Sequence, residues 1–145
     1  MKTFKGLLKT LPDNGIFVFF NDITGKMDRG PAKIAKEHFG AIEGKFSHSM
    51  GQSYAIVVKF HDPKDKDMRF MLGQIDTFYR IARRDSDKLF YVMCHDEFNF
   101  HNYTTDDMIK AFKSKLIPNN IIWEESFYEL LHGKIIKPKI QNDEI

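Results

Sequence analysis

Apolar residues occur along the chain in short continuous runs, and segments with helical spacing of apolar residues separate these runs. The first run, residues 16–20, lies between Pro12-Asp13-Asn14-Gly15 and Asn21-Asp22, which are turn-forming sequences. A continuous apolar run of this length is typical of a strand buried on both faces, as in parallel sheets. Further runs predict strands at residues 54–60, 89–94 and 121–123.

Four other segments predict helices. Pro31 opens the first, where its missing N–H costs no hydrogen bond, and Gly40 ends it. The second has the clearest helical period and ends at two arginines that complement its dipole. Thr104 and Asp107 resemble a capping box at the start of the third, and the fourth covers residues 124–132. The expected buried faces are Ala32, Ala35 and Phe39 in the first helix, Met68, Met71, Leu72, Ile75, Phe78, Tyr79 and Ala82 in the second, and Met108, Ala111, Phe112 and Leu116 in the third.

Strands and helices therefore alternate along the whole sequence. Such alternation predicts an α/β fold with a mainly parallel sheet covered by helices on both faces. The length of 145 residues is that of one compact domain. We expect a single α/β domain over residues 1–133, followed by a polar C-terminal tail over residues 134–145.

Composition and charge narrow the class of partner. Hydrophobic residues make up 42% of the chain, which is enough for a core without disulfides or metals. The net charge of +2 is too small to predict binding to nucleic acid or to a membrane surface. The single cysteine favours a reducing compartment, and no apolar run resembles a signal peptide or a membrane span. We therefore expect a cytoplasmic protein, in the host cytoplasm if a phage encodes it.

Ligands of parallel sheets bind beyond the carboxyl ends of the strands, and this rule selects the loops at residues 21–30 and 95–103. In the first loop, two glycines before a helix N-terminus allow backbone N–H groups to face an anion, and two cations add charge. The alternative is a polar turn in which an Asn or Asp side chain bonds its own backbone. The candidate ligand-binding residues here are Asn21, Asp22, Gly25, Lys26, Arg29 and Gly30.

The second loop concentrates polar and aromatic groups. Its histidines and carboxylates could form an acid–base set, but no H-E-x-x-H spacing predicts a metal site. Ser47 lies beside an imidazole, yet no Gly-x-Ser-x-Gly elbow predicts a hydrolase triad. No cofactor is predicted. The candidate ligand-binding residues are His95, Asp96, Asn99, His101 and Asn102, together with Phe46 and Ser47 from the middle of the chain.

Several segments carry a resemblance to a known family, among them Gly40-Ala41-Ile42 and the helix entry at Gly30, Ala32 and Lys33. The hexapeptide Gly51-Gln52-Ser53-Tyr54-Ala55-Ile56 is the most specific, and residues 17–25 and 103–109 match at the level of pattern. Over residues 15–131 the chain resembles small phage and bacterial proteins related to macro domains. The resemblance implies a macro-like, three-layer α/β fold with a mixed, mainly parallel sheet, and recognition of ADP-ribose or a similar nucleotide. It also implies that an asparagine near the end of the first strand contacts a ribose.

The sequence departs from the family pattern at the end of the first strand and at several glycines. Asp22 stands where the family has the asparagine, and Asn21 stands beside it where serine is usual. Asp28, Phe46 and His48 replace glycines, and residues 97–102 replace a glycine-rich loop with bulky side chains. Bulky side chains hinder close approach of the backbone to a pyrophosphate. A different nucleotide, a ligand that stacks on aromatic rings, or a protein partner is consistent with these changes.

Three functions follow as hypotheses. The first is a nucleotide-binding module for ADP-ribose or a related nucleotide, cyclic and signalling forms included. The second is a phage factor that binds and inhibits a host enzyme or defence protein. The third is a hydrolase of an ADP-ribose derivative, in which Asp22 or Asp96 positions water and His95 or His101 is the general acid. For this hydrolase, Asp22 and His101 are the proposed catalytic pair.

Overall fold

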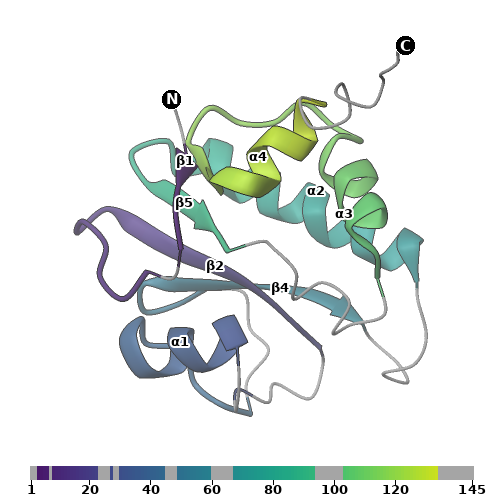
Figure 1. The fold of residues 1–145 in the computed structure, drawn as a ribbon. Coiled ribbons are helices and arrows are strands. Elements are labelled where there is room, and N and C mark those ends of the chain that lie inside the picture. Colours follow the sequence, from purple (N-terminus) through teal and green to yellow (C-terminus); the bar gives the residue numbers. More distant parts are fainter. Residues whose placement is uncertain are drawn as a thin grey trace.

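A computed structural model describes residues 3–6, 8–22, 27, 30–44, 49–59, 67–93 and 103–133 of the chain. Within these ranges, six strands form one sheet and four helices cover it (Figure 1). The strands are β1 (Thr3–Phe4), β2 (Gly15–Asp22), β3 (Ser49–Met50), β4 (Ser53–Lys59), β5 (Leu89–Val92) and β6 (Ile121–Glu124). The helices are α1 (Gly30–His38), α2 (Met68–Arg84), α3 (Thr105–Phe112) and α4 (Glu125–Leu131).

The sheet has the order β1-β6-β5-β2-β4-β3. Every neighbouring pair is parallel except β3 and β4, which are antiparallel. The longest strand, β2, lies in the centre and pairs with β4 on one side and with β5 on the other. The expected α/β fold with a mixed, mainly parallel sheet is therefore confirmed.

Alternate residues of β2 enter two different cores. Phe17 and Phe19 pack on the α1 side, where the rings of Phe17 and Phe39 stack at 4.7 Å. Val18 and Phe20 pack on the opposite side, beneath α2, α3 and α4. Figure 1 shows α1 alone on its face of the sheet and the other three helices together on the other face. The sheet is thus the middle one of three layers.

The elements expected from the sequence are present, with small changes at their ends. Helix α2 begins at Met68 and ends at Arg84, as the helical spacing of its apolar residues predicts. The capping box of α3 is confirmed, because Thr104 and Asp107 each accept a hydrogen bond from the backbone N–H of the other. The short strands β1 and β3 were not predicted, since two residues carry no periodic pattern.

Two residues expected on buried faces are exposed. Helix α3 ends at Phe112, so the helical period does not extend to Leu116, whose exposed fraction is 83%. Leu72 lies at the margin of the apolar stripe of α2 and is 36% exposed. The predicted strand ends at Phe60 and Cys94 and the predicted tail at residues 134–145 lie outside the described residues.

The hexapeptide of the family resemblance has a structural role at the start of β4. Nε2 of Gln52 donates to the carbonyl oxygens of Pro12 and Gly15 at 2.9 and 3.0 Å, which fixes the turn before β2. Gly51 (φ +56°) lies against Gly40 (φ +80°), and a Cβ on Gly51 would lie 3.0 Å from the Gly40 Cα. Both positions therefore require glycine for conformation and for space.

We expect Gly51→Ala to destabilise the protein by about 2 kcal/mol or more, because it combines a left-handed conformation with a backbone clash. Gly73→Ala is the matched control: Gly73 lies inside α2, and nothing lies within 4 Å of an added Cβ. This control should stabilise by about 0.5–1 kcal/mol, since alanine is the better helix former. Urea denaturation measures both, and equal stability of Gly51→Ala and wild type would contradict the packing argument.

The burial of Tyr54 predicts a loss of stability at alkaline pH. Its side chain is buried against Phe78, with ring centroids 5.1 Å apart, and this burial raises the pKa of the Tyr54 hydroxyl above its ordinary value. The unfolded chain ionises this tyrosine near pH 10 while the folded chain keeps it protonated. Stability should therefore fall above pH 10, by about 1.4 kcal/mol per pH unit from this residue. Tyr54→Phe should remove that part of the slope in denaturation series at pH 9–11, and parallel slopes would refute it.

Candidate functional site

The predicted ligand loops follow two neighbouring strands. Because β2 and β5 are parallel and paired, the segments after them, residues 23–29 and 94–102, start at the same edge of the sheet. Two described residues mark this edge. Met27 and Met93 are both buried in the core on the α1 side, and the Met93 N–H donates to the Val18 carbonyl oxygen at 2.9 Å.

The chain leaves these two strands in opposite directions. From β2 it passes through α1 to β4, and from β5 it passes through α3 to β6 on the other side of the sheet. Helices α1 and α3 also lie on opposite faces (Figure 1). This arrangement is a topological switch point, where open α/β sheets bind ligands beyond the carboxyl ends of the strands.

Three of the predicted site residues lie in the described part of this edge. Asn21 is buried near the end of β2, on the face that Phe17 and Phe19 share. Asp22 ends the strand, and the pairing register with β4 shifts between these two residues. Gly30 begins α1 with a φ of +63°. The other candidates, Gly25, Lys26, Arg29, Phe46, Ser47, His95, Asp96, Asn99, His101 and Asn102, lie outside the described residues.

Helix α1 presents its N-terminus to the same edge. The first-turn N–H groups of a helix have no intrahelical acceptor, and the helix dipole favours an anion there. The first turn of α1 contains no acidic residue that would occupy this position, while Lys36 and His38 lie in the last turn. Ala32 and Ala35 hold the helix on the sheet, so its N-terminus is fixed.

Tyr103 links three elements at the same edge of the sheet, on the side of β4. Its buried hydroxyl donates to the Val58 carbonyl oxygen at 2.8 Å and accepts from the Asp67 N–H at 2.9 Å. One side chain thereby joins the end of β4, the start of α2 and the start of α3. The sequence does not predict this role, because a tyrosine between a loop and a helix cap has no periodic signal.

Comparisons with known proteins add no assignment. No protein-family model matches this sequence, and neither the curated proteins nor the solved structures give a significant match. The resemblance to macro-domain-like proteins stays a prediction from its motifs. Its most specific motif, the hexapeptide, lies at the amino end of β4 and makes scaffold contacts there.

Within the described ranges, no group of three His, Cys, Asp or Glu side chains gathers in an arrangement that could hold a metal ion. No helix in those ranges has the length and hydropathy of a membrane-spanning segment.

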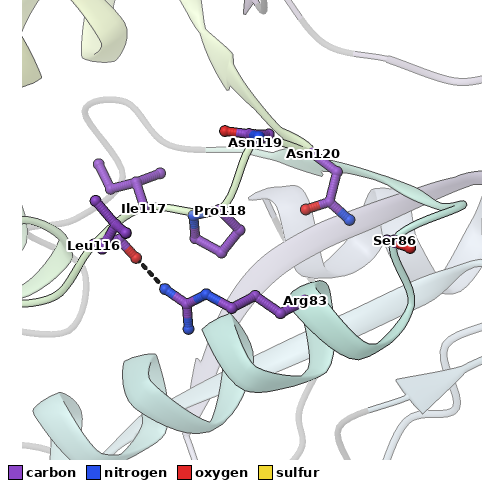
Figure 2. A pocket seen from close by; sticks show the side chains of 7 residues that line it. All are labelled: Arg83, Ser86, Leu116, Ile117, Pro118, Asn119 and Asn120. Carbon is purple, nitrogen blue, oxygen red and sulfur yellow. Dashed lines mark hydrogen bonds between the residues drawn. The ribbon is translucent and has the colours of Figure 1, made fainter.

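A pocket of about 430 Å³ lies at the other edge of the sheet, beside the amino ends of β5 and β6 (Figure 2). Arg83 and Ser86 line it from the end of α2 and the following turn, and residues 116–120 line it from the segment before β6. None of the predicted site residues lines this pocket. The sequence does not predict this pocket, because its walls are a helix end and a turn that meet only in the folded chain.

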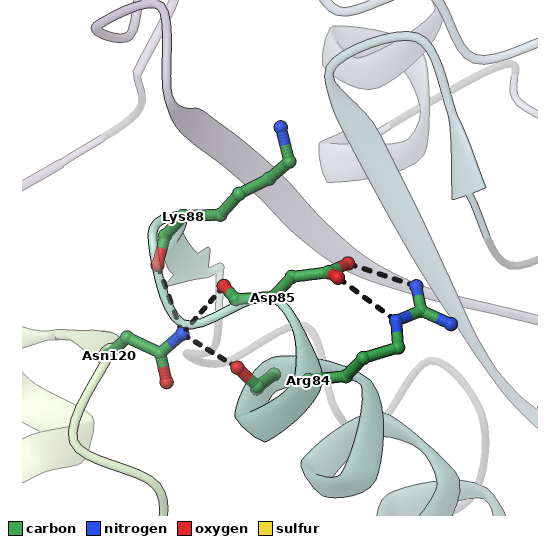
Figure 3. A network of polar contacts seen from close by, with 5 residues as sticks. Arg84, Asp85, Lys88 and Asn120 are labelled. Atoms are coloured by element: carbon green, nitrogen blue, oxygen red, sulfur yellow. Dashed lines mark hydrogen bonds and ion pairs between the residues drawn. The ribbon is translucent and has the colours of Figure 1, made fainter.

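Asn120 fixes one wall of this pocket (Figure 3). Its Nδ2 donates to the carbonyl oxygens of Ala82 at 2.8 Å and Lys88 at 3.0 Å, with a longer contact to Asp85 at 3.3 Å. These carbonyls belong to the end of α2 and its turn, where the helix leaves acceptors unpaired. Next to them, the hydrogen bond from Arg84 lowers the pKa of the Asp85 carboxyl.

We expect Tyr103→Phe to reduce the free energy of unfolding by about 1–3 kcal/mol, because it leaves the Val58 carbonyl and the Asp67 N–H without this partner. Tyr128→Phe is the matched control, since the half-buried Tyr128 makes no hydrogen bond to the described residues through its hydroxyl. Urea denaturation of both variants measures the difference. Equal losses for the two variants would show that the Tyr103 hydroxyl does not hold the three elements together.

Proposed function

We propose that this chain binds a nucleotide, ADP-ribose or a related compound, at the carboxyl ends of β2 and β5. The single observation that carries the proposal is the switch point: two adjacent parallel strands whose connections diverge to opposite faces. A crevice of this kind is where doubly wound sheets accept nucleotides. The motif resemblance to macro-domain-like proteins favours ADP-ribose among them.

The described residues supply groups that suit the parts of such a ligand. The N-terminus of α1, free of acidic residues in its first turn, favours a phosphate group. Asp22 stands where the family has the asparagine that contacts a ribose, and the neighbouring Asn21 supplies an amide at the end of the central strand. Tyr103 fixes the ends of the neighbouring segments, which limits the conformational entropy lost on binding.

We propose that the protein acts in a reducing cytoplasm. One cysteine among 145 residues is typical of a reducing cytoplasm. The net charge of +2 favours a small-molecule ligand over nucleic acid. For a phage protein, this setting is the host cytoplasm.

Thermal unfolding with ADP-ribose, AMP and ribose 5-phosphate tests the proposal. A ligand that binds only the folded state at 100 times its Kd adds about 2.7 kcal/mol of stability, so the melting temperature rises. We expect the largest rise for ADP-ribose, since it alone offers two phosphates and two riboses. No rise with any of the three at millimolar concentration would refute nucleotide binding.

Asp22→Ala locates the site, and we expect it to change ADP-ribose affinity at least fivefold because Asp22 ends β2 at the crevice. Asp87→Ala is the matched control, removing an exposed carboxylate from the α2–β5 turn at the other edge of the sheet. Equal affinities of the two variants would place the ligand elsewhere.

The hydrolase hypothesis is tested by chromatography of ADP-ribose after incubation with the protein. Turnover by the wild type that is lost in Asp22→Ala and in His101→Ala would support it.

A further inference from the structure

The pocket at the amino edge of the sheet is centred on Arg83. One Nη of this side chain donates to the Leu116 carbonyl oxygen (Figure 2). Its guanidinium carbon lies 5.9 Å from the centre of the Tyr79 ring. Both contacts hold the guanidinium at the pocket wall. A guanidinium has five N–H donors, so this single hydrogen bond leaves others for a ligand. No carboxylate among the described residues forms an ion pair with Arg83.

The surroundings of Arg83 carry excess positive charge. Arg80, one turn earlier on α2, and Lys115, next to the pocket, both pair with Asp76 at 3.5 Å. Together with Arg83, these are three cations against one carboxylate, which leaves two positive charges in excess. A concave surface with such an excess attracts anions.

The rest of the pocket combines polar and apolar groups. Ser86 and Asn119 contribute a hydroxyl and an amide at its rim. Leu116, Ile117 and Pro118 form the apolar wall, and Leu116 is 83% exposed there. The volume of about 430 Å³ is within the range of small-molecule sites.

The pocket is also preformed. Asn120 ties the segment before β6 to the end of α2, and the Asn120 carbonyl accepts from the Phe90 N–H at 2.9 Å. The Arg83–Leu116 hydrogen bond closes the other end. A fixed wall needs little ordering when a ligand arrives.

We propose that this pocket binds a small organic anion in which a carboxylate or phosphate is attached to an apolar ring. The anionic group pairs with the Arg83 guanidinium, and the ring packs on Leu116, Ile117 and Pro118. Guanidinium groups bind carboxylate and phosphate in the same forked geometry, so both anions are included. This site is independent of the nucleotide crevice, which lies at the opposite edge of the sheet.

Amide chemical-shift titration tests this site with four probes: phenyl phosphate, benzoate, benzyl alcohol and inorganic phosphate. We expect saturable shifts at Ser86, Ile117, Asn119 and Asn120 with the first two probes. Benzyl alcohol lacks the anion and inorganic phosphate lacks the ring, so each should bind at least fivefold more weakly than phenyl phosphate. Equal affinity for benzyl alcohol and phenyl phosphate, or no saturable shifts at these four residues, would overturn the proposal.

Substitutions separate a specific contact from general attraction. Arg83→Gln should weaken phenyl phosphate binding at least fivefold, while Arg80→Gln, which removes the same charge outside the pocket, should weaken it less than twofold. Leu116→Ala should weaken phenyl phosphate without changing inorganic phosphate. Equal weakening by the two arginine substitutions would overturn the proposal. The wild-type titration with the four probes tests the proposed anion site even if a variant fails to fold.

The two binding proposals fail separately. ADP-ribose at the crevice should shift residues at the ends of β2 and β5, such as Asn21 and Met93, whereas phenyl phosphate should shift the pocket residues. Phenyl phosphate shifts that appear at Asn21 and Met93 instead would assign the anion to the crevice and overturn the pocket proposal.

Discussion

The structure depends on the burial of β2 on both faces and its hydrogen bonding along both edges. Phe17, Val18 and Phe19 are 0% exposed, and their backbone pairs with β4 and β5 at once. No polar side chain can occupy these positions without losing water on every side. The apolar run of β2 therefore requires helices above and below, and α1 and α2 supply them from the connections on either side of β4.

This central position also decides where the carboxyl end of β2 lies. A strand in the middle of a parallel sheet has its carboxyl end in the middle of one edge, and β2 shares that edge with β5. The connections that leave β2 and β5 lie on opposite faces, because α1 packs on one face of the sheet and α3 on the other. The switch point is thus a consequence of chain order.

The amino edge, like the carboxyl edge at Tyr103, is held by side-chain hydrogen bonds to backbone. Gln52 fixes the turn before β2, and Asn120 fixes the turn before β5. Their amides donate to backbone carbonyl groups in the turns and at the end of α2. The Arg83 pocket lies between the end of α2 with its turn and the segment before β6.

Local patterns in the sequence determined the elements themselves. The period of α2, the capping box of α3 and the apolar run of β2 each act within a few residues, so the sequence alone predicts them. The same patterns placed the loops after β2 and β5 as candidates. They failed at Leu116, where the helix had ended, and at β1 and β3, which are two residues long and carry no periodic pattern. The pairing partner of β1 is also distant in the chain. Strand order, the Tyr103 contacts and the Arg83 pocket were decided only by tertiary structure, because each joins segments more than 30 residues apart that no local period relates.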